Sequence, residues 1–470
     1  MKLYSENEHY KLYEGSMLDM LEVIEPNSID SIITDPPYEL NFMNKGWDNS
    51  GIAFQSDTWK KCFEVLKPGG YLLSFGGSRT FHRIACAIED AGFEIRDTIM
   101  WLYGSGFPKS MDIGKALDKK NGVKPIGRKE PTGGITGGHN TGATEKGWHN
   151  INNWYEYPEC ENDWKGWGTA LKPSFEPIIV ARKPFKGSCV DNIIENGVGG
   201  INIDECRVEY EKTTNPATNP LYRQQNADQY KQVQGGELSN GAVSWTSGKN
   251  GVNEGGRFPA NTILTYDESD FEEVCGGFPI SNKPNGNITK KYKMNNQVYG
   301  DYGYCNTWDA YQDSGSASRY FYCAKASKKD RDEGLDNFEP STDKAKGNGL
   351  DRVCEFCGVS QLTPELCKCE TKSWITKPKK NIHPTVKPTE LMQYLVRLVS
   401  PKGSTILDCF NGSGSTGKAV MYENKERNAD YKYIGIELTP EYLPIAKARI
   451  EYVCKDMDIV QEQYDFDDLD

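Results

Sequence analysis

Apolar runs alternate with amphipathic segments in the first hundred residues, and this alternation predicts strands and helices in turn. The run from Ser28 to Thr34 is rich in β-branched residues and lacks Gly and Pro, which is typical of a short buried strand. Further elements are expected at 55–66 (helix), 71–75 (strand), 80–91 (helix) and 93–102 (strand). Strands that alternate with helices indicate an α/β fold, here a Rossmann-like, mostly parallel twisted sheet with helices on both faces.

The last part of the chain shows the same alternation. Its pattern predicts a helix over 389–400, a strand over 404–407, a helix ending near Tyr422, a strand over 431–436 and a last helix over 441–453. At the amino-terminal end, residues 3–21 are expected to form one strand, a turn and a short helix.

The composition is that of a soluble, loop-rich protein with ample material for a large core. The chain has 470 residues, of which 37% are hydrophobic and 47 are Gly. No run approaches about 18 consecutive apolar residues and the N-terminus has no apolar signal region, so we expect no membrane span. Fourteen cysteines without a signal region suit a reducing compartment, and we therefore expect a cytoplasmic protein.

The formal charge of −12 is unevenly distributed. Residues 451–470 hold eight acidic side chains and one Lys, so more than half of the excess lies at the C-terminus. We expect an acidic tail over 456–470 that is disordered beyond about Val460. The rest of the chain is close to neutral, which leaves room for a local basic face that binds nucleic acid.

A rigid turn follows the first buried strand at Asp35-Pro36-Pro37-Tyr38. Each proline fixes φ and lacks a backbone donor, so the strand ends there and the turn is stiff. The turn presents a carboxylate, fixed carbonyl groups and an aromatic ring at the carboxyl end of a strand, where open α/β sheets bind ligands.

A second turn, Asp408 to Gly417, lies between a predicted strand and a predicted helix. Its glycines allow close backbone approach, and the helix N-terminus offers free N–H groups, as in nucleotide sites. No Lys-Thr or Lys-Ser pair follows, which argues against a P-loop and ATP. Glu437 ends the next strand, where a carboxylate suits two ribose hydroxyls; the alternative is an acid that caps the following helix.

Four cysteines form a cluster with the spacing C-x2-C, nine residues, then C-x-C: Cys354, Cys357, Cys367 and Cys369. Two close thiolate pairs suit a tetrahedral structural zinc ion. Four thiolates leave no open position for water, so the predicted role is structural. A redox pair and four unbound thiols are the alternatives.

The stretches ITDPPY, LKPGGYLLSFGGSRT and HPTVKPTEL, with the glycine-rich turn far downstream, resemble the β class of S-adenosylmethionine-dependent DNA amino-methyltransferases. The long insertions resemble phage-borne or solitary members, which implies a bacterial or phage-infected cell. The family also serves restriction-modification, and the sequence leaves open whether a restriction partner exists. The family binds S-adenosylmethionine, acts on double-stranded DNA and often dimerises. The cofactor contacts that the resemblance implies are Asp408, Phe410, Asn411, Gly412, Ser413, Gly414 and Glu437. Thr385 and Lys387 would approach the methionine end of the cofactor, with Lys387 on its α-carboxylate, unless this segment is only a structural turn.

The resemblance also assigns the domains. Residues 1–103 would be the catalytic half of the core, 104–170 a flexible inserted loop region, and 171–184 the final core strand. Residues 185–380 would form an irregular target-recognition region that carries the zinc knuckle at 354–369. Residues 381–455 would be the cofactor-binding half, and 456–470 the acidic tail.

The resemblance implies a mechanism. An exocyclic amine is a poor nucleophile because its lone pair is delocalised into the ring. Asp35 and the carbonyl of Pro36 would accept its two N–H bonds, and Tyr38 would stack on the extruded base. Positioning and electrostatics would supply most of the acceleration.

Alternatives remain for the substrate and the class. We predict adenine N6 as the acceptor, with cytosine N4 as the alternative because both amines offer the same donor pair. A Pro-Cys nucleophile is absent from the matching turn, so a covalent C5 mechanism is not expected. The alternative from another class is an inactive, zinc-containing DNA-binding protein, and methylation of RNA or of protein Gln is a third.

Overall fold

The computed structural model describes most of the two predicted halves and part of the middle of the chain. The described residues are 1–40, 50–103, 110–123, 162–208, 257–266, 321–325, 329–338, 369 and 380–467, with two- and three-residue strands at 127–128, 155–156, 280–281, 292–293, 304–305, 315–316, 352–354 and 374–376.

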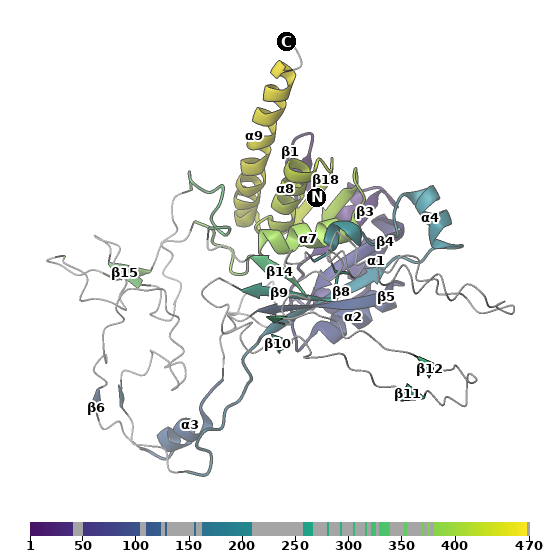
Figure 1. Cartoon of the computed structure of the whole chain (residues 1–470). Coiled ribbons are helices and arrows are strands. Elements are labelled where there is room, and N and C mark those ends of the chain that lie inside the picture. The colour runs from purple at the N-terminus through teal and green to yellow at the C-terminus, as the bar shows by residue number, and fades with distance from the viewer. Residues whose placement is uncertain are drawn as a thin grey trace.

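A ten-stranded sheet forms the centre of the molecule (Figure 1). In spatial order its strands are β1 (Lys2–Glu6), β2 (Tyr10–Glu14), β18 (Lys432–Glu437), β17 (Thr405–Asp408), β3 (Ile29–Thr34), β4 (Leu66–Phe75), β8 (Phe175–Arg182), β5 (Glu94–Tyr103), β9 (Thr262–Tyr266) and β14 (Tyr322–Lys325). Pairing is parallel from β2 to β4 and from β5 to β14. Only β1 and β8 run against their neighbours in this sheet. The prediction of an α/β fold with a mostly parallel sheet is therefore confirmed.

Helices cover both faces of the sheet, as predicted (Figure 1). One face packs against α7 (Thr389–Val399), α8 (Ser415–Arg427) and α9 (Leu443–Asp467), and the other against η1 (Met17–Glu22), α1 (Ser56–Val65) and α2 (Phe81–Asp90). Strand β8 shows the reason: Ile178 and Val180 belong to the first core, whereas Ile179 and Ala181 belong to the second. Successive side chains of a strand point to opposite faces, so a strand buried on both sides reads as a continuous apolar run.

The remaining elements are short. They are η4 (Ile52–Phe54), α3 (Ile113–Lys120), β6 (Gly127–Arg128), β7 (Tyr155–Glu156), α4 (Cys189–Asn196), η5 (Asp204–Cys206), β10 (Ile280–Ser281), β11 (Tyr292–Lys293), β12 (Tyr304–Cys305), β13 (Gly315–Ser316), β15 (Arg352–Cys354), β16 (Trp374–Thr376) and η11 (Pro440–Tyr442).

The N-terminal and C-terminal halves of the core meet in the middle of the sheet. Strand β17 pairs in parallel with β3, with Ile406 opposite Ser31 and Leu407 opposite Ile32. Because parallel neighbours end at the same edge, the turn after β3 and the turn after β17 lie side by side. Such a junction between two halves of an open sheet is where α/β proteins form their ligand sites.

The antiparallel direction of β8 brings its first residues to this same edge. Leu102, near the end of β5, pairs with Phe175 at the start of β8. The inserted segment between these strands therefore leaves and re-enters the sheet at neighbouring positions. It also means that Glu176 lies at the edge where β3 and β17 end.

Two predicted elements differ from the observed ones. The N-terminal segment forms the β1–β2 hairpin in place of one strand, because the side chain of Asn7 accepts hydrogen bonds from the backbone of His9 and Tyr10 and turns the chain. The expected disorder beyond Val460 is wrong as far as Asp467, since α9 continues to that residue (Figure 1). No Gly or Pro follows Pro444 in α9, so nothing in its sequence interrupts the helix.

Strands β9 and β14 come from the region assigned to target recognition, yet they extend the central sheet. That region therefore contributes to the core as well. Within the described ranges, no helix is long and apolar enough to cross a membrane.

Candidate active site

The turn that follows β4 contacts and supports the turn after β3. Thr80 donates a hydrogen bond from Oγ1 to the carbonyl oxygen of Tyr38 at 2.8 Å. A side chain on Gly77 would begin 3.3 Å from Cδ2 of Tyr38, so glycine permits this close approach. The sequence GGSRT thus serves as a support for the Asp35–Tyr38 turn.

The carboxylate of Asp35 has two different oxygens. Oδ2 lies 2.6 Å from Nζ of Lys387, which comes from the loop before α7. Oδ1 is buried and has no hydrogen-bond partner among the described residues. One oxygen is therefore fixed by a cation, and the other is an acceptor available to a ligand.

Glu176 completes this group. Its Oε2 accepts a hydrogen bond from the Tyr38 hydroxyl at 2.7 Å and lies 3.4 Å from Nζ of Lys387. Burial alone would lower the pKa of Lys387, but Asp35 and Glu176 raise it above its ordinary value. Burial and the two carboxylates raise the pKa of Tyr38, so its hydroxyl stays protonated and donates.

Lys387 lies against the Asp35–Tyr38 turn, and its predicted contact with a cofactor carboxylate stays a prediction. Its ammonium is enclosed by acids and aromatic rings, 4.8 Å from the ring centroid of Phe75 and 5.3 Å from that of Tyr38. The side chain is 8% exposed, whereas Asp35 and Glu176 are 21% and 22% exposed. The structure thus brings Lys387 to the Asp35–Tyr38 turn.

Asp408 connects the two turns. Its Oδ1 accepts a hydrogen bond from the Thr34 hydroxyl at 2.7 Å and one from the backbone N–H of Phe410 at 3.1 Å. Its Oδ2 accepts from the Thr416 hydroxyl at 2.6 Å. Burial raises the pKa of Asp408 to about 6. The carboxylate is occupied within the protein, so it holds the turn in shape, and its predicted contact with a cofactor stays a prediction.

The glycine-rich turn requires Gly at two positions. Gly412 and Gly414 have φ of 53° and 74°, in the left-handed region. A Cβ on Gly412 would lie 2.9 Å from Nε2 of His383, and one on Gly414 would lie 3.0 Å from Ala446. Burial lowers the pKa of His383 to about 4, so its ring is neutral at pH 7.

Glu437 lies beside this turn, as the sequence predicts. Oε2 accepts from the N–H of Gly412 and Oε1 from the N–H of Thr439, each at 2.7 Å. Burial nevertheless raises its pKa to about 7. Because Oε1 accepts from the N–H of Thr439, just before η11, the helix-capping alternative holds in part. Each carboxylate oxygen of Glu437 can accept a second hydrogen bond, which suits ribose hydroxyls.

The other residues with a predicted cofactor contact have different surroundings: two are held by hydrogen bonds, one is half-buried and one is exposed. Asn411 is held by the Tyr433 hydroxyl at 2.7 Å. Ser413 receives hydrogen bonds from the buried guanidinium of Arg449 through its carbonyl and its hydroxyl. Phe410 is half-buried against the core, and Thr385 is exposed. Cofactor contacts by these residues stay predictions.

A buried ionic cluster lies beneath the glycine-rich turn. Lys418, fully buried in α8, lies 2.5 Å from Oδ1 of Asp330 and 2.6 Å from Oε2 of Glu333. Asp330 also accepts from the N–H and hydroxyl of Thr389, the first residue of α7. Burial opposes ionisation, but these partners hold the pKa of Asp330 below its ordinary value. Lys418 is therefore engaged inside the protein.

Two of the four predicted zinc ligands can be placed. Cys354 ends β15, and its sulphur lies 3.8 Å from that of Cys369. Cys357 and Cys367 lie outside the described residues. Among the residues described, no group of three or more metal-binding side chains is present.

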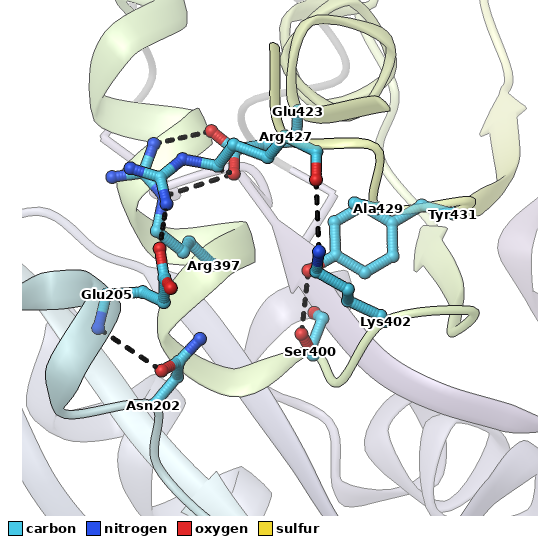
Figure 2. A pocket seen from close by; sticks show the side chains of 9 residues that line it. All are labelled: Asn202, Glu205, Arg397, Ser400, Lys402, Glu423, Arg427, Ala429 and Tyr431. Carbon is cyan, nitrogen blue, oxygen red and sulfur yellow. Dashed lines mark hydrogen bonds and ion pairs between the residues drawn. The ribbon is translucent and has the colours of Figure 1, made fainter. Parts of the chain in front are cut away.

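A cavity of about 220 Å³ lies at the opposite, amino-terminal end of β17 and β18 (Figure 2). Arg397 and Arg427 pair there with Glu423, and Arg427 also pairs with Glu205 of η5. These ion pairs tie the segment that follows α4 to α7 and α8. The cavity is thus separate from the paired turns.

Several residues of the site escaped sequence reasoning. Thr34 and Glu176 belong to predicted strand segments and Asp330 to a region without predicted elements. The partners of all three are more than 80 positions away in the chain. Position at the end of a strand was a usable signal for Thr34 and Glu176. No local pattern indicates a buried ion pair such as that of Asp330.

Comparison with known proteins identifies the family of this chain. The family model N6_N4_Mtase, described as DNA methylase, matches residues 29–448. Because the match spans most of the chain, the protein belongs to this DNA methylase family.

Individual relatives match shorter parts. The type II methyltransferase M.HindIII of Haemophilus influenzae is 23% identical over 235 residues, which cover 41% of this chain and 64% of that protein. M2.LlaDCHI of Lactococcus lactis subsp. cremoris is 32% identical over 120 residues, which cover 21% of this chain and 44% of that protein. The chain thus spans less than two thirds of these relatives. The solved PvuII DNA methyltransferase, titled cytosine-N4-specific, aligns with 94% of this chain and 86% of its own at 13% identity, with a TM-score of 0.37.

Proposed function

We propose that the protein transfers a methyl group from S-adenosylmethionine to the exocyclic N6 amine of an adenine flipped out of duplex DNA. The observation that carries this proposal is that the two carboxylate oxygens of Asp35 have different surroundings. Lys387 fixes one oxygen, while the other is a buried acceptor beside the glycine-rich turn. A target amine needs such an acceptor.

The protein's own residues account for activation of the amine. The free oxygen of Asp35 and the carbonyl of Pro36 accept its two N–H bonds, which favours a tetrahedral nitrogen with an available lone pair. Tyr38, fixed through its hydroxyl and its carbonyl oxygen, presents a ring for stacking on the extruded base. Lys387 acts in this proposal on Asp35, and not on a cofactor carboxylate.

The turn after β17 fits the cofactor. Gly412 and Gly414 hold this turn in a left-handed conformation that a Cβ would prevent, and Glu437 offers acceptor positions for ribose hydroxyls. Bound there, S-adenosylmethionine would supply an electrophilic methyl group. The hydrogen bond between Thr34 and Asp408 keeps the turn that holds it next to the turn that holds the amine.

Nucleoside analysis tests the proposal. The full-length protein is incubated with unmethylated plasmid DNA and S-adenosylmethionine labelled in its methyl group, and the DNA is digested and separated by mass. We expect labelled N6-methyladenine from the wild type and at least about 100-fold less from D35A. Labelled N4-methylcytosine alone would overturn the adenine assignment, and an active D35A would overturn the mechanism.

A structural zinc ion at Cys354, Cys357, Cys367 and Cys369 remains part of the proposal. The distance of 3.8 Å between the sulphurs of Cys354 and Cys369 supports it. Two thiolates bound to one tetrahedral zinc at about 2.3 Å each would lie about 3.8 Å apart. The ion would order this part of the recognition region, with no part in methyl transfer.

A further inference from the structure

Three charged side chains share the acceptor end of the site. The Lys387 ammonium lies 2.6 Å from Asp35 and 3.4 Å from Glu176. Two carboxylates therefore face one buried cation, which gives the group a net charge of −1. Asp35 carries the free buried acceptor oxygen, whereas Oε2 of Glu176 is occupied by the Tyr38 hydroxyl and by Lys387.

Methylation of an amine by a sulfonium produces a proton that must leave. The nitrogen lone pair forms a bond to the methyl carbon, and the carbon–sulphur bond breaks with its electron pair going to sulphur. The nitrogen then bears a positive charge until it loses one hydrogen as H⁺. The nearest base on the protein is the free oxygen of Asp35, which already accepts that N–H in the proposed function.

Protonation of Asp35 removes the negative charge that Lys387 faces. A buried ammonium without a counter-ion is strongly disfavoured. With Asp35 as its only partner, Lys387 would therefore oppose uptake of the proton. Glu176 changes this balance because it stays ionised against Lys387 when Asp35 becomes neutral.

We propose that Glu176 is a second counter-ion of Lys387 that allows Asp35 to take up the proton released by the methylated amine. The inference rests on the proposed function. Glu176 acts through Lys387 and is thus a positioning and charge-balancing residue. The group begins with a net charge of −1 and ends neutral, with Lys387 paired at both stages.

Charge-changing variants separate this role from simple support of Tyr38. E176Q keeps the size of the side chain and an oxygen that accepts the Tyr38 hydrogen bond, but it removes the second counter-ion. The double variant E176Q/K387Q removes the cation as well, and the Gln at 387 can still donate an N–H to Asp35. E89Q, on the exposed side of α2, is the matched control.

The experiment measures single-turnover methyl transfer into plasmid DNA with saturating enzyme and labelled S-adenosylmethionine. Binding of S-adenosylhomocysteine and the melting temperature are measured for each variant. We expect E176Q to transfer about 100-fold more slowly than the wild type with S-adenosylhomocysteine still bound, and the double variant to be faster than E176Q. E176D, which keeps the charge, is expected to stay within about tenfold of the wild type.

A wild-type rate in E176Q would overturn the inference. So would a double variant no faster than E176Q, because support of Tyr38 alone predicts no recovery when the cation is removed. An E176D variant as slow as E176Q would contradict it too. If the wild type itself transfers no label, the proposed function fails and this inference with it.

Discussion

Thr34 donates a hydrogen bond to Asp408 across 374 positions of sequence, at a distance of 2.7 Å. The bond joins the last residue of β3 to the last residue of β17, directly before the two turns of the candidate active site. The two halves of the site are thus held together at their base by two buried side chains.

Replacing Thr34 by Val tests this connection. T34V keeps the shape of the side chain but leaves Asp408 with one donor fewer, so we expect the free energy of unfolding to fall by about 2 kcal/mol. Urea denaturation of T34V measures the loss, and T405V, at the half-buried start of β17, is the control. An unchanged stability in T34V would show that the hydrogen bond does not hold the halves together.

The carboxyl group of Glu437 predicts a dependence of stability on pH. Burial raises its pKa from 4.5 to about 7, so the folded state binds the proton more tightly than the unfolded chain. The stabilisation is complete below pH 4.5 and is lost as the pH rises through about 7. The difference corresponds to about 3 kcal/mol.

E437Q isolates this effect from other titrating groups. We expect the stability of the wild type relative to E437Q to fall by about 3 kcal/mol between pH 4.5 and 8, measured by urea denaturation at each pH. Asp408 titrates in both proteins, so only its electrostatic coupling to Glu437 remains in the difference. Parallel pH profiles for the two proteins would contradict the prediction.

Asp330 should be needed for folding of the cofactor half. D330N removes one of two carboxylates that face the fully buried Lys418, and we expect a loss of about 3–5 kcal/mol in the free energy of unfolding. Asp336 serves as the control because its side chain is 87% exposed and its ion pair with Lys380 is long, at 3.6 Å. D336N should change stability by less than about 0.5 kcal/mol. Similar losses in both variants would contradict a special role for Asp330.

Metal analysis tests the cysteine cluster. Protein purified without chelator is expected to hold about one zinc ion per chain, and C354S should lose it because a three-thiolate site binds more weakly. C86S, which alters an exposed cysteine of α2, should retain the metal. Wild-type protein free of zinc would rule out the structural metal.

Elements with a strong local pattern could be predicted closely from the sequence. The strand predicted over 28–34 is observed as Ile29–Thr34, and the helix predicted over 389–400 is observed as Thr389–Val399. Apolar periodicity, Pro and Gly are local signals, so they locate such elements without knowledge of their partners.

The direction of strands and the partners of buried charges could not be predicted in this way. The apolar pattern of a run such as 178–182 is the same in a parallel and in an antiparallel strand. The direction of this strand nevertheless decides that Glu176 lies at the edge of the sheet where β3 and β17 end. The role of Lys387 likewise depends on two acids in distant segments. Electrostatic partners are set by tertiary structure and leave no periodic trace in the sequence.

The pairing of Leu102 with Phe175 fixes both ends of the segment between β5 and β8, so this segment can be replaced as a unit. Its two ends are fixed to adjacent strands, so a longer or shorter insert changes mainly the entropy of closing a loop, by about 0.6 kcal/mol for each doubling of length. The strands of the sheet can keep their register while the inserted segment is exchanged for another. A foreign segment grafted between these two residues would thus lie next to the Asp35–Tyr38 turn without changing the pairing of the sheet.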